Sequence, residues 1–316
     1  MPAAYIASMN QALAAEDDRL TAAFVTPTHP VSFLIGLPRT GKTLFHQAVA
    51  TALDIGYVSN LLNKFWRAPY LGACLERDVL QEAPESSFRS RYGNTSGAGE
   101  PGEWGWFWRH WLGLADGQHH LTPGADLSAL ASKLAALETA KGKPLFFNNM
   151  YAVSNLNLLD DLLEKLLVID KPRDPYWICS SVINARVKRH GDVAAHFANL
   201  PRTNDALPAV SDPVEQVVLQ VRALLDEMAA IRRLVGPENV FVVDFQRFLA
   251  DPKAELDALR EFWLGHGVRA EWTGRALPER FDDRNDPGLI DPTYRDRLNR
   301  AFVRHFGEPA LPALVA

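Results

Sequence analysis

Hydrophobic residues gather in short continuous runs, separated by stretches with helical periodicity. The runs at 31–36, 166–170 and 240–243 have the length and composition of strands buried on both faces of a parallel sheet, and 144–148 is a further short candidate. Helices are expected at 4–24, 43–53, 125–141, 154–164, from 175 onward, and at 212–235, 253–264 and 293–305. Strands that alternate with helices predict an α/β fold, in which helices flank a parallel sheet on both faces.

Residues with capping chemistry indicate where several helices begin and end. Asp174 before Pro175 is a favoured helix start, because the carboxylate accepts a hydrogen bond from the first turn and proline fits its first position. Asp212 precedes another proline in the same way. Gly142 and Gly236 are expected at the C-terminal ends of two helices.

Residues from about 60 to 142 break this regular alternation. A glycine-rich loop at 96–102 precedes an aromatic block at 104–111, whose tryptophans are too dense for one face of a helix. Some of these rings are expected in the core and others on the wall of a pocket, with core packing the commoner role for any single ring. Because no internal repeat or linker is evident, we expect residues 1–316 to form a single α/β domain with this helical, aromatic-rich insertion.

Composition and charge narrow the classes of function. The chain has 316 residues, with 33 Lys and Arg against 38 Asp and Glu, and its net charge of −5 disfavours nucleic acid as a partner. Two cysteines are too few for a secreted disulfide scaffold. Neither a signal peptide nor an apolar run of the ~20 residues that span a bilayer is visible, so we expect a cytoplasmic protein with no membrane span.

Residues 36–43, Gly-Leu-Pro-Arg-Thr-Gly-Lys-Thr, match the phosphate-loop (P-loop) pattern G-x-x-x-x-G-K-[ST] in full. The motif lies between the first predicted strand and a helix, which is the position that its mechanism requires. Backbone amides and the positive end of the helix bind an anion there, and Arg39 and Lys42 add full charges. The loop therefore predicts phosphate binding.

The loop alone leaves the identity of the nucleotide open. A kinase would place Lys42 on the terminal phosphates of ATP and Thr43 on Mg²⁺, and would add a carboxylate at the end of a second strand. Asp170 and Asp244 both stand at the end of predicted strands.

A second cationic motif follows the predicted strand 166–170. Residues 173–175 read Arg-Asp-Pro, and Ser181 stands eight residues after the arginine. Together with the Pro-Arg-Thr-Gly-Lys-Thr segment at 38–43, this order and spacing resembles the sulfotransferases that use 3′-phosphoadenosine 5′-phosphosulfate (PAPS). The L-x-D-P-x-x-x-L pattern at 249–256 is similar to a segment near the C-terminus of that family. The resemblance spans residues from about 30 to 265.

The resemblance implies that the two anionic ends of PAPS bind at two sites. The phosphate loop would hold the 5′-phosphosulfate, and the arginine and serine of the second motif would hold the 3′-phosphate. Both motifs follow strands, where open parallel sheets bind ligands. The implied donor-binding residues are Arg39, Thr40, Gly41, Lys42, Thr43, Arg173 and Ser181. In this reading Lys42 is also catalytic, since it would stabilise charge on the leaving oxygen, and no metal is required.

The general base is expected in the insertion, between the two nucleotide motifs. Glu103 ranks first as a catalytic residue, because burial beside the aromatic block would raise its pKa. A helix-capping role is the alternative for this glutamate. The further candidates for the base are Glu100, His110, His119 and His120. His46 is expected to be structural. The basic run of Arg186, Lys188 and Arg189 is expected to be a solvated helix end, with contact to the 3′-phosphate as the alternative.

The sequence departs from the family pattern mainly on the acceptor side. Residues 147–150 read Phe-Asn-Asn-Met where many relatives carry K-[ST]-P, and 245–247 read Phe-Gln-Arg in place of an acidic turn.

The sequence leaves three hypotheses for the function. The first is a sulfotransferase that moves a sulfuryl group from PAPS to a hydroxyl or amine of a small molecule or glycan, and Arg173 with Ser181 favours it. The second is a kinase that uses ATP and Mg²⁺, which Asp170 favours. The third is a non-catalytic nucleotide-binding protein.

Overall fold

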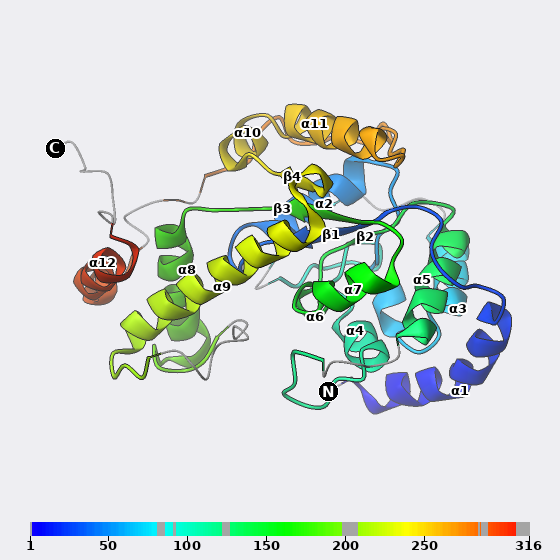
Figure 1. Cartoon of the computed structure of the whole chain (residues 1–316), viewed down its shortest axis with the longest axis horizontal. Coiled ribbons are helices and arrows are strands. Elements are labelled where there is room, and N and C mark those ends of the chain that lie inside the picture. The colour runs from blue at the N-terminus through cyan, green and yellow to red at the C-terminus, as the bar shows by residue number, and fades with distance from the viewer. Residues whose placement is uncertain are drawn as a thin grey trace.

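The chain forms a small parallel sheet flanked by helices (Figure 1). The computed structural model describes residues 2–80, 86–90, 93–121, 127–197, 208–283, 285 and 290–307. The strands are β1 (Val31–Ile35), β2 (Phe146–Phe147), β3 (Leu166–Asp170) and β4 (Val240–Val242). The helices are α1 (Ala4–Thr21), α2 (Lys42–Ala52), α3 (Pro69–Val79), α4 (Gly105–Trp111), α5 (Ser128–Lys141), α6 (Met150–Val153), α7 (Leu156–Leu162), α8 (Pro175–His190), α9 (Pro213–Val235), α10 (Phe245–Ala250), α11 (Pro252–Gly265) and α12 (Pro292–Phe306), with 3₁₀ turns η1 (Leu62–Lys64) and η3 (Pro237–Asn239).

The sheet has the order β2-β1-β3-β4, and the strand pairs are parallel. β1 and β3 are paired along their whole length, from Val31 opposite Leu166 to Ile35 opposite Asp170. Because the strands are parallel, their carboxyl ends lie at one edge of the sheet. The loops that leave β1 and β3 therefore emerge side by side, which confirms the predicted α/β arrangement.

Each face of the sheet is buried by a different set of helices. Side chains alternate along a strand, so Phe33 and Val168 pack on one face while Leu34 and Ile169 pack on the other. The first face is covered by helices from α4 to α9, and the second by α2, α10 and α11. In Figure 1, α10 and α11 lie above the sheet, and α4, α6 and α7 lie below it.

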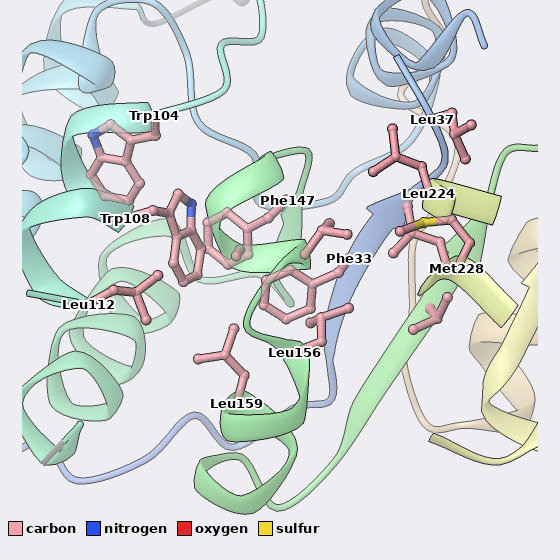
Figure 2. Close-up of a cluster of buried hydrophobic side chains, with 14 of the residues drawn as sticks. Phe33, Leu37, Trp104, Trp108, Leu112, Phe147, Leu156, Leu159, Leu224 and Met228 are labelled. Carbon is pink, nitrogen blue, oxygen red and sulfur yellow. The ribbon is translucent and has the colours of Figure 1, made fainter. Parts of the chain in front are cut away.

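The aromatic block of the insertion supplies much of the core on the first face. Trp108 lies edge-on to Phe33 of β1 and Phe147 of β2, with ring centroids 5.8 Å and 5.2 Å apart (Figure 2). The Trp104 ring stacks on Phe107 at 3.8 Å. Trp104 and Trp108 have no exposed surface, whereas Trp106 is half-buried. The insertion is thus held to the sheet by its aromatic rings.

Most predicted elements are present, with small shifts at their ends. The helix predicted at 125–141 begins at Ser128, and residues 125 and 126 lie outside the described part of the chain. Asp174 and Asp212 cap α8 and α9 as expected. Helices α3, α6 and α10 were not predicted. No described helix is both long and apolar enough to cross a membrane.

Trp108→Ala tests the role of the aromatic block. The substitution leaves a cavity between β1, β2 and α4, and it is expected to lower the free energy of unfolding by about 3–5 kcal/mol. Chemical denaturation followed by circular dichroism measures the change. Tyr5→Ala is the matched control, because Tyr5 is 74% exposed and its removal should change stability by less than ~0.5 kcal/mol. Equal effects of the two substitutions would contradict this account of the core.

Candidate functional site

The phosphate loop connects β1 to α2 and is shaped by an unusually close backbone contact. Gly36 has φ +132°, and a Cβ at this position would lie 2.6 Å from the carbonyl oxygen of Lys171, at the end of β3. Only glycine allows the two chain segments to approach so closely. Gly41 and Arg39 also have positive φ angles, and the Thr40 hydroxyl donates to the Leu37 carbonyl at 2.9 Å. These features fold the loop into a tight turn at the start of α2.

The side chain of Lys42 is buried within the loop. Its ammonium donates to the carbonyls of Gly36 and Leu37, the latter at 2.9 Å. Burial lowers the pKa of Lys42 to about 8, while the charges of Glu103 and Asp170 act to raise it. The ammonium is therefore close enough to both carboxylates to interact with them, and it carries a titratable charge at the centre of the site.

The structure brings the two cationic motifs into direct contact. Arg39 Nε donates to the Ser181 hydroxyl at 2.9 Å, and Arg173 Nη1 donates to the Arg39 carbonyl at 2.6 Å. Arg173 also donates through Nε and Nη2 to Asn285 Oδ1. Burial, and secondarily the charge of Arg39, lowers the pKa of Arg173. The neighbouring Asp174 accepts a hydrogen bond from the Tyr176 amide as the cap of α8.

Asp170, at the end of β3, is held by an arginine of a neighbouring helix. Its buried carboxylate forms an ion pair with Arg232 of α9. Burial raises the pKa of Asp170, while Arg232, Lys42 and Lys171 act to lower it. Because Arg232 occupies this carboxylate, the geometry gives less support to a Mg²⁺-binding role than the sequence does.

Glu103 lies at the border of the insertion and interacts electrostatically with Lys42. Its side chain is exposed to solvent, although neighbouring protein atoms partly desolvate its carboxylate. Burial raises the pKa of Glu103, and the positive charge of Lys42 acts to lower it. In the described structure α4 has no side-chain N-cap, so the capping role considered for this glutamate is absent.

Two features fix the backbone around Glu103. Asn149, which follows β2, donates through Nδ2 to the Glu103 carbonyl at 2.7 Å, and its Oδ1 accepts from the Ala152 amide at 3.0 Å. The next residue, Trp104, has φ +53°, a conformation that non-glycine residues rarely adopt. Such strain persists only where the surrounding contacts enforce it, and it is common at functional sites.

The other candidates for the base lie elsewhere or have structural partners. Glu100 accepts hydrogen bonds from Gln47 Nε2 at 2.9 Å and from the Ser87 amide at 2.7 Å, and so joins α2 to the loop before the insertion helix. His110 interacts electrostatically with Arg67 and Asp18, near α1 and α3.

The remaining histidines and the basic run are likewise accounted for by packing. The His119 ring stacks on Tyr151 at 5.3 Å, and His120 lies near the Ser154 carbonyl. His46 is buried, and burial lowers its pKa to about 3, so its imidazole is neutral. Arg186 is buried and donates to Gln220. Lys188 and Arg189 lie at the exposed end of α8, whereas Arg186 is buried and so departs from the solvated helix end that was expected for it.

Comparison with known proteins supports the resemblance at the level of fold. Neither a protein-family model nor a curated protein sequence matches the chain. Among solved structures, the sulfotransferase STF1 of Mycobacterium tuberculosis aligns with a TM-score of 0.50 and 15% identity, over 81% of this chain and 72% of that one. The chain has the fold of a sulfotransferase.

Other sulfotransferases align less closely. STF9 of Mycobacterium avium aligns with a TM-score of 0.47 and 17% identity, over 92% of this chain and 81% of that one. The sulfotransferase of Alicyclobacillus acidocaldarius aligns with a TM-score of 0.43 and 15% identity, over 88% and 92%.

Three residues of this sulfotransferase-fold site were missed by the sequence interpretation. Asn149 could have been noticed, because an asparagine directly after a strand and before a helix is a typical N-cap. No local sequence pattern marks Arg232 or Asn285 as a site residue. They reach Asp170 and Arg173 from segments that are distant in sequence, and nothing local to either residue indicates the contact.

Gly36→Ala tests the close approach of the phosphate loop to β3. The new methyl group would collide with the Lys171 carbonyl, and alanine is strained at φ +132°, so we expect the free energy of unfolding to fall by at least about 2 kcal/mol. Gly142→Ala is the control, because Gly142 also has a positive φ, of +63°, but has open space around its Cβ position. Thermal denaturation compares the two, and a loss at Gly36 no larger than at Gly142 would contradict the proposed contact.

Proposed function

We propose that this protein is a sulfotransferase that moves a sulfuryl group from PAPS to a hydroxyl or amine acceptor. The observation that carries the proposal is the linked set of Arg39, Ser181 and Arg173, which joins the phosphate loop to the loop after β3. A ligand with anionic groups at both ends of an adenosine needs two cationic sites. This arrangement offers them side by side at the carboxyl edge of the sheet.

The proposed donor contacts follow from the local chemistry. Backbone amides of the loop at 40–43 and the Thr43 hydroxyl would hold the 5′-phosphosulfate at the start of α2. Arg173 and Ser181 would hold the 3′-phosphate, for which the planar guanidinium is well suited. Arg39 stands between these groups, because its side chain contacts Ser181 and its carbonyl contacts Arg173.

In the proposed reaction, the acceptor oxygen or nitrogen attacks sulfur in line with the bond to the 5′-phosphate oxygen. The new bond to sulfur forms as the old one breaks, and 3′-phosphoadenosine 5′-phosphate (PAP) leaves with the bonding electron pair. Glu103 takes the proton of the acceptor, and Lys42 stabilises the negative charge on the leaving oxygen. The electrostatic interaction between Glu103 and Lys42 supports this pairing of roles.

The insertion at about 60–142 is the proposed acceptor side, because Glu103 lies within it. On α4, which follows Glu103, the Arg109 guanidinium forms an ion pair with Asp116 and lies 5.1 Å from the centre of the half-buried Trp106 ring and 5.9 Å from that of Tyr151. Partly exposed aromatic rings beside a cation favour a small molecule or a glycan as the acceptor. The kinase alternative is not favoured, since Arg232 occupies Asp170.

Nucleotide binding separates the two enzyme hypotheses. Isothermal titration calorimetry should show tight binding of PAP and weak or no binding of ATP–Mg²⁺. Arg173→Ala should weaken PAP binding by about 10–100-fold, because charge-assisted hydrogen bonds contribute about 1.5–3 kcal/mol. Lys188→Ala, at the exposed end of α8, is the control and should bind normally. Tight binding of ATP–Mg²⁺ without PAP would exclude the proposal.

The pH dependence of transfer tests the assigned roles. Glu103 must be deprotonated and Lys42 protonated, so the rate should rise as the pH passes the elevated pKa of Glu103 and fall above about pH 8, where Lys42 loses its proton. Transfer from PAPS to a panel of phenols, alcohols and amines measures the profile. Glu103→Gln should abolish the acidic limb while sparing PAP binding, and Lys42→Ala should abolish transfer. If Glu103→Gln retains full transfer, Glu103 is not the base.

A further inference from the structure

Lys171 is a buried cation that the proposed reaction does not use. It follows Asp170 directly at the end of β3, and its side chain has no exposed surface. Within the described structure its ammonium has no hydrogen-bond partner. Instead it lies 4.1 Å from the ring centre of Phe245 and 5.1 Å from that of Phe248, both on α10. Burying an ammonium without a hydrogen-bond partner lowers the stability of the folded protein, so a functional role for Lys171 is worth considering.

The carboxylates that face Lys171 are already engaged with other groups. Glu255 of α11 is fully buried, accepts from the Asp244 amide at 2.9 Å and forms an ion pair with Arg247. Asp244 caps α10 by accepting from the Arg247 amide. On its own strand, Asp170 is paired with Arg232.

Within the described structure, none of these carboxylates forms a hydrogen bond with the Lys171 ammonium. Arg173, two residues further along the chain, adds a second cation that acts against its protonation. Burial is the main cause that lowers the pKa of Lys171, to about 7, and Glu255, Asp244 and Asp170 compensate only in part.

Two contacts connect Lys171 to the donor site. Its amide donates to the Ile35 carbonyl at 3.1 Å, and its own carbonyl lies directly against Gly36 at the start of the phosphate loop. Its side chain shares an aromatic ring with the second motif, because the Arg173 guanidinium carbon lies 5.9 Å from the centre of the Phe245 ring. The same ring thus contacts both cations.

We propose that Lys171 is a positioning residue for the donor site, which holds Phe245 beneath Arg173 and supplies a buried positive charge that a bound phosphate compensates. The inference rests on the proposed function, in that it takes the 3′-phosphate of PAP as the ligand of Arg173. A dianion close to Lys171 favours its charged form. Binding of the nucleotide therefore draws a proton onto the lysine.

The sign of the effect follows from the titration of the free protein. Above about pH 7, Lys171 is mostly neutral in the free protein, so nucleotide binding takes up a proton and the affinity falls as the pH rises. Lys42, with a pKa of about 8, and the phosphate itself also titrate near neutral pH. The proton uptake that Lys171 contributes is therefore measured as the difference in proton uptake between the unsubstituted protein and a variant at position 171.

Calorimetric titration of PAP at pH 7.5, in two buffers with different ionisation enthalpies, measures affinity and proton uptake together. Lys171→Met should weaken PAP binding about tenfold and remove part of the proton uptake, while the unliganded variant keeps or gains thermal stability, because methionine removes a buried amine that has no hydrogen-bond partner in the described structure. Lys171→Arg should retain affinity but lose that part of the uptake, since arginine does not titrate in this range. Lys141→Met is the control: this lysine is half-buried and pairs with Glu76, and its loss should leave both the affinity for PAP and the proton uptake unchanged.

Phe245→Leu keeps the inference testable if substitutions of Lys171 prevent folding. Removing the shared ring should weaken PAP binding several-fold. If the unsubstituted protein binds PAP and Lys171→Met binds it with the same affinity and proton uptake, the inference is overturned while the proposed function stands. If the unsubstituted protein does not bind PAP, both fail. A loss of stability in Lys171→Met without any change in binding shows a purely structural role and also overturns the inference.

Discussion

The close contact between the ends of β1 and β3 is the constraint on which the site depends. The two strands are in register up to Ile35 and Asp170, and the chain then turns so tightly that Gly36 touches the Lys171 carbonyl. The loop after β1 and the loop after β3 therefore begin close together. Groups more than 130 residues apart in sequence are consequently held within hydrogen-bond distance, as the contact between Arg173 and the Arg39 carbonyl shows.

Charge at this edge of the sheet differs in sign from the charge of the whole chain. The net charge is −5, yet Arg39, Lys42, Lys171 and Arg173 cluster at the carboxyl ends of two strands. The neighbouring carboxylates are largely neutralised by Arg232 and by other arginines. Lys42 and Lys171 are buried, whereas Arg39 and Arg173 are half-buried. Concentrating cations in this way destabilises the folded chain, and such an arrangement is typical of a site that gains its counter-charge from a ligand.

The parts of this structure that could be predicted from sequence are those with a local signal. β1 and β3 are continuous apolar runs, the phosphate loop has a complete motif, and Asp174 marks the start of α8. The spacing of Arg173 and Ser181 indicated a joint site, although not that Arg39 would contact both.

Contacts between distant segments could not be predicted in this way. The pairing of Asp170 with Arg232, and of Arg173 with Asn285, depends on how α9 and the segment before α12 pack against the sheet edge. The enforced conformation at Trp104 likewise has no sequence signal, since a bulky residue is unfavourable there and is tolerated only because its ring stacks in the core.

The hydrogen bond from Asn149 acts on the backbone of residue 103 and not on its side chain. Asn149 donates to the carbonyl of residue 103, a group that every amino acid provides. The position of this backbone segment is therefore independent of the side chain it carries. A histidine, an aspartate or an alanine could replace the glutamate without loss of this hydrogen bond, so the chemistry of the position can change while the fold around it stays the same.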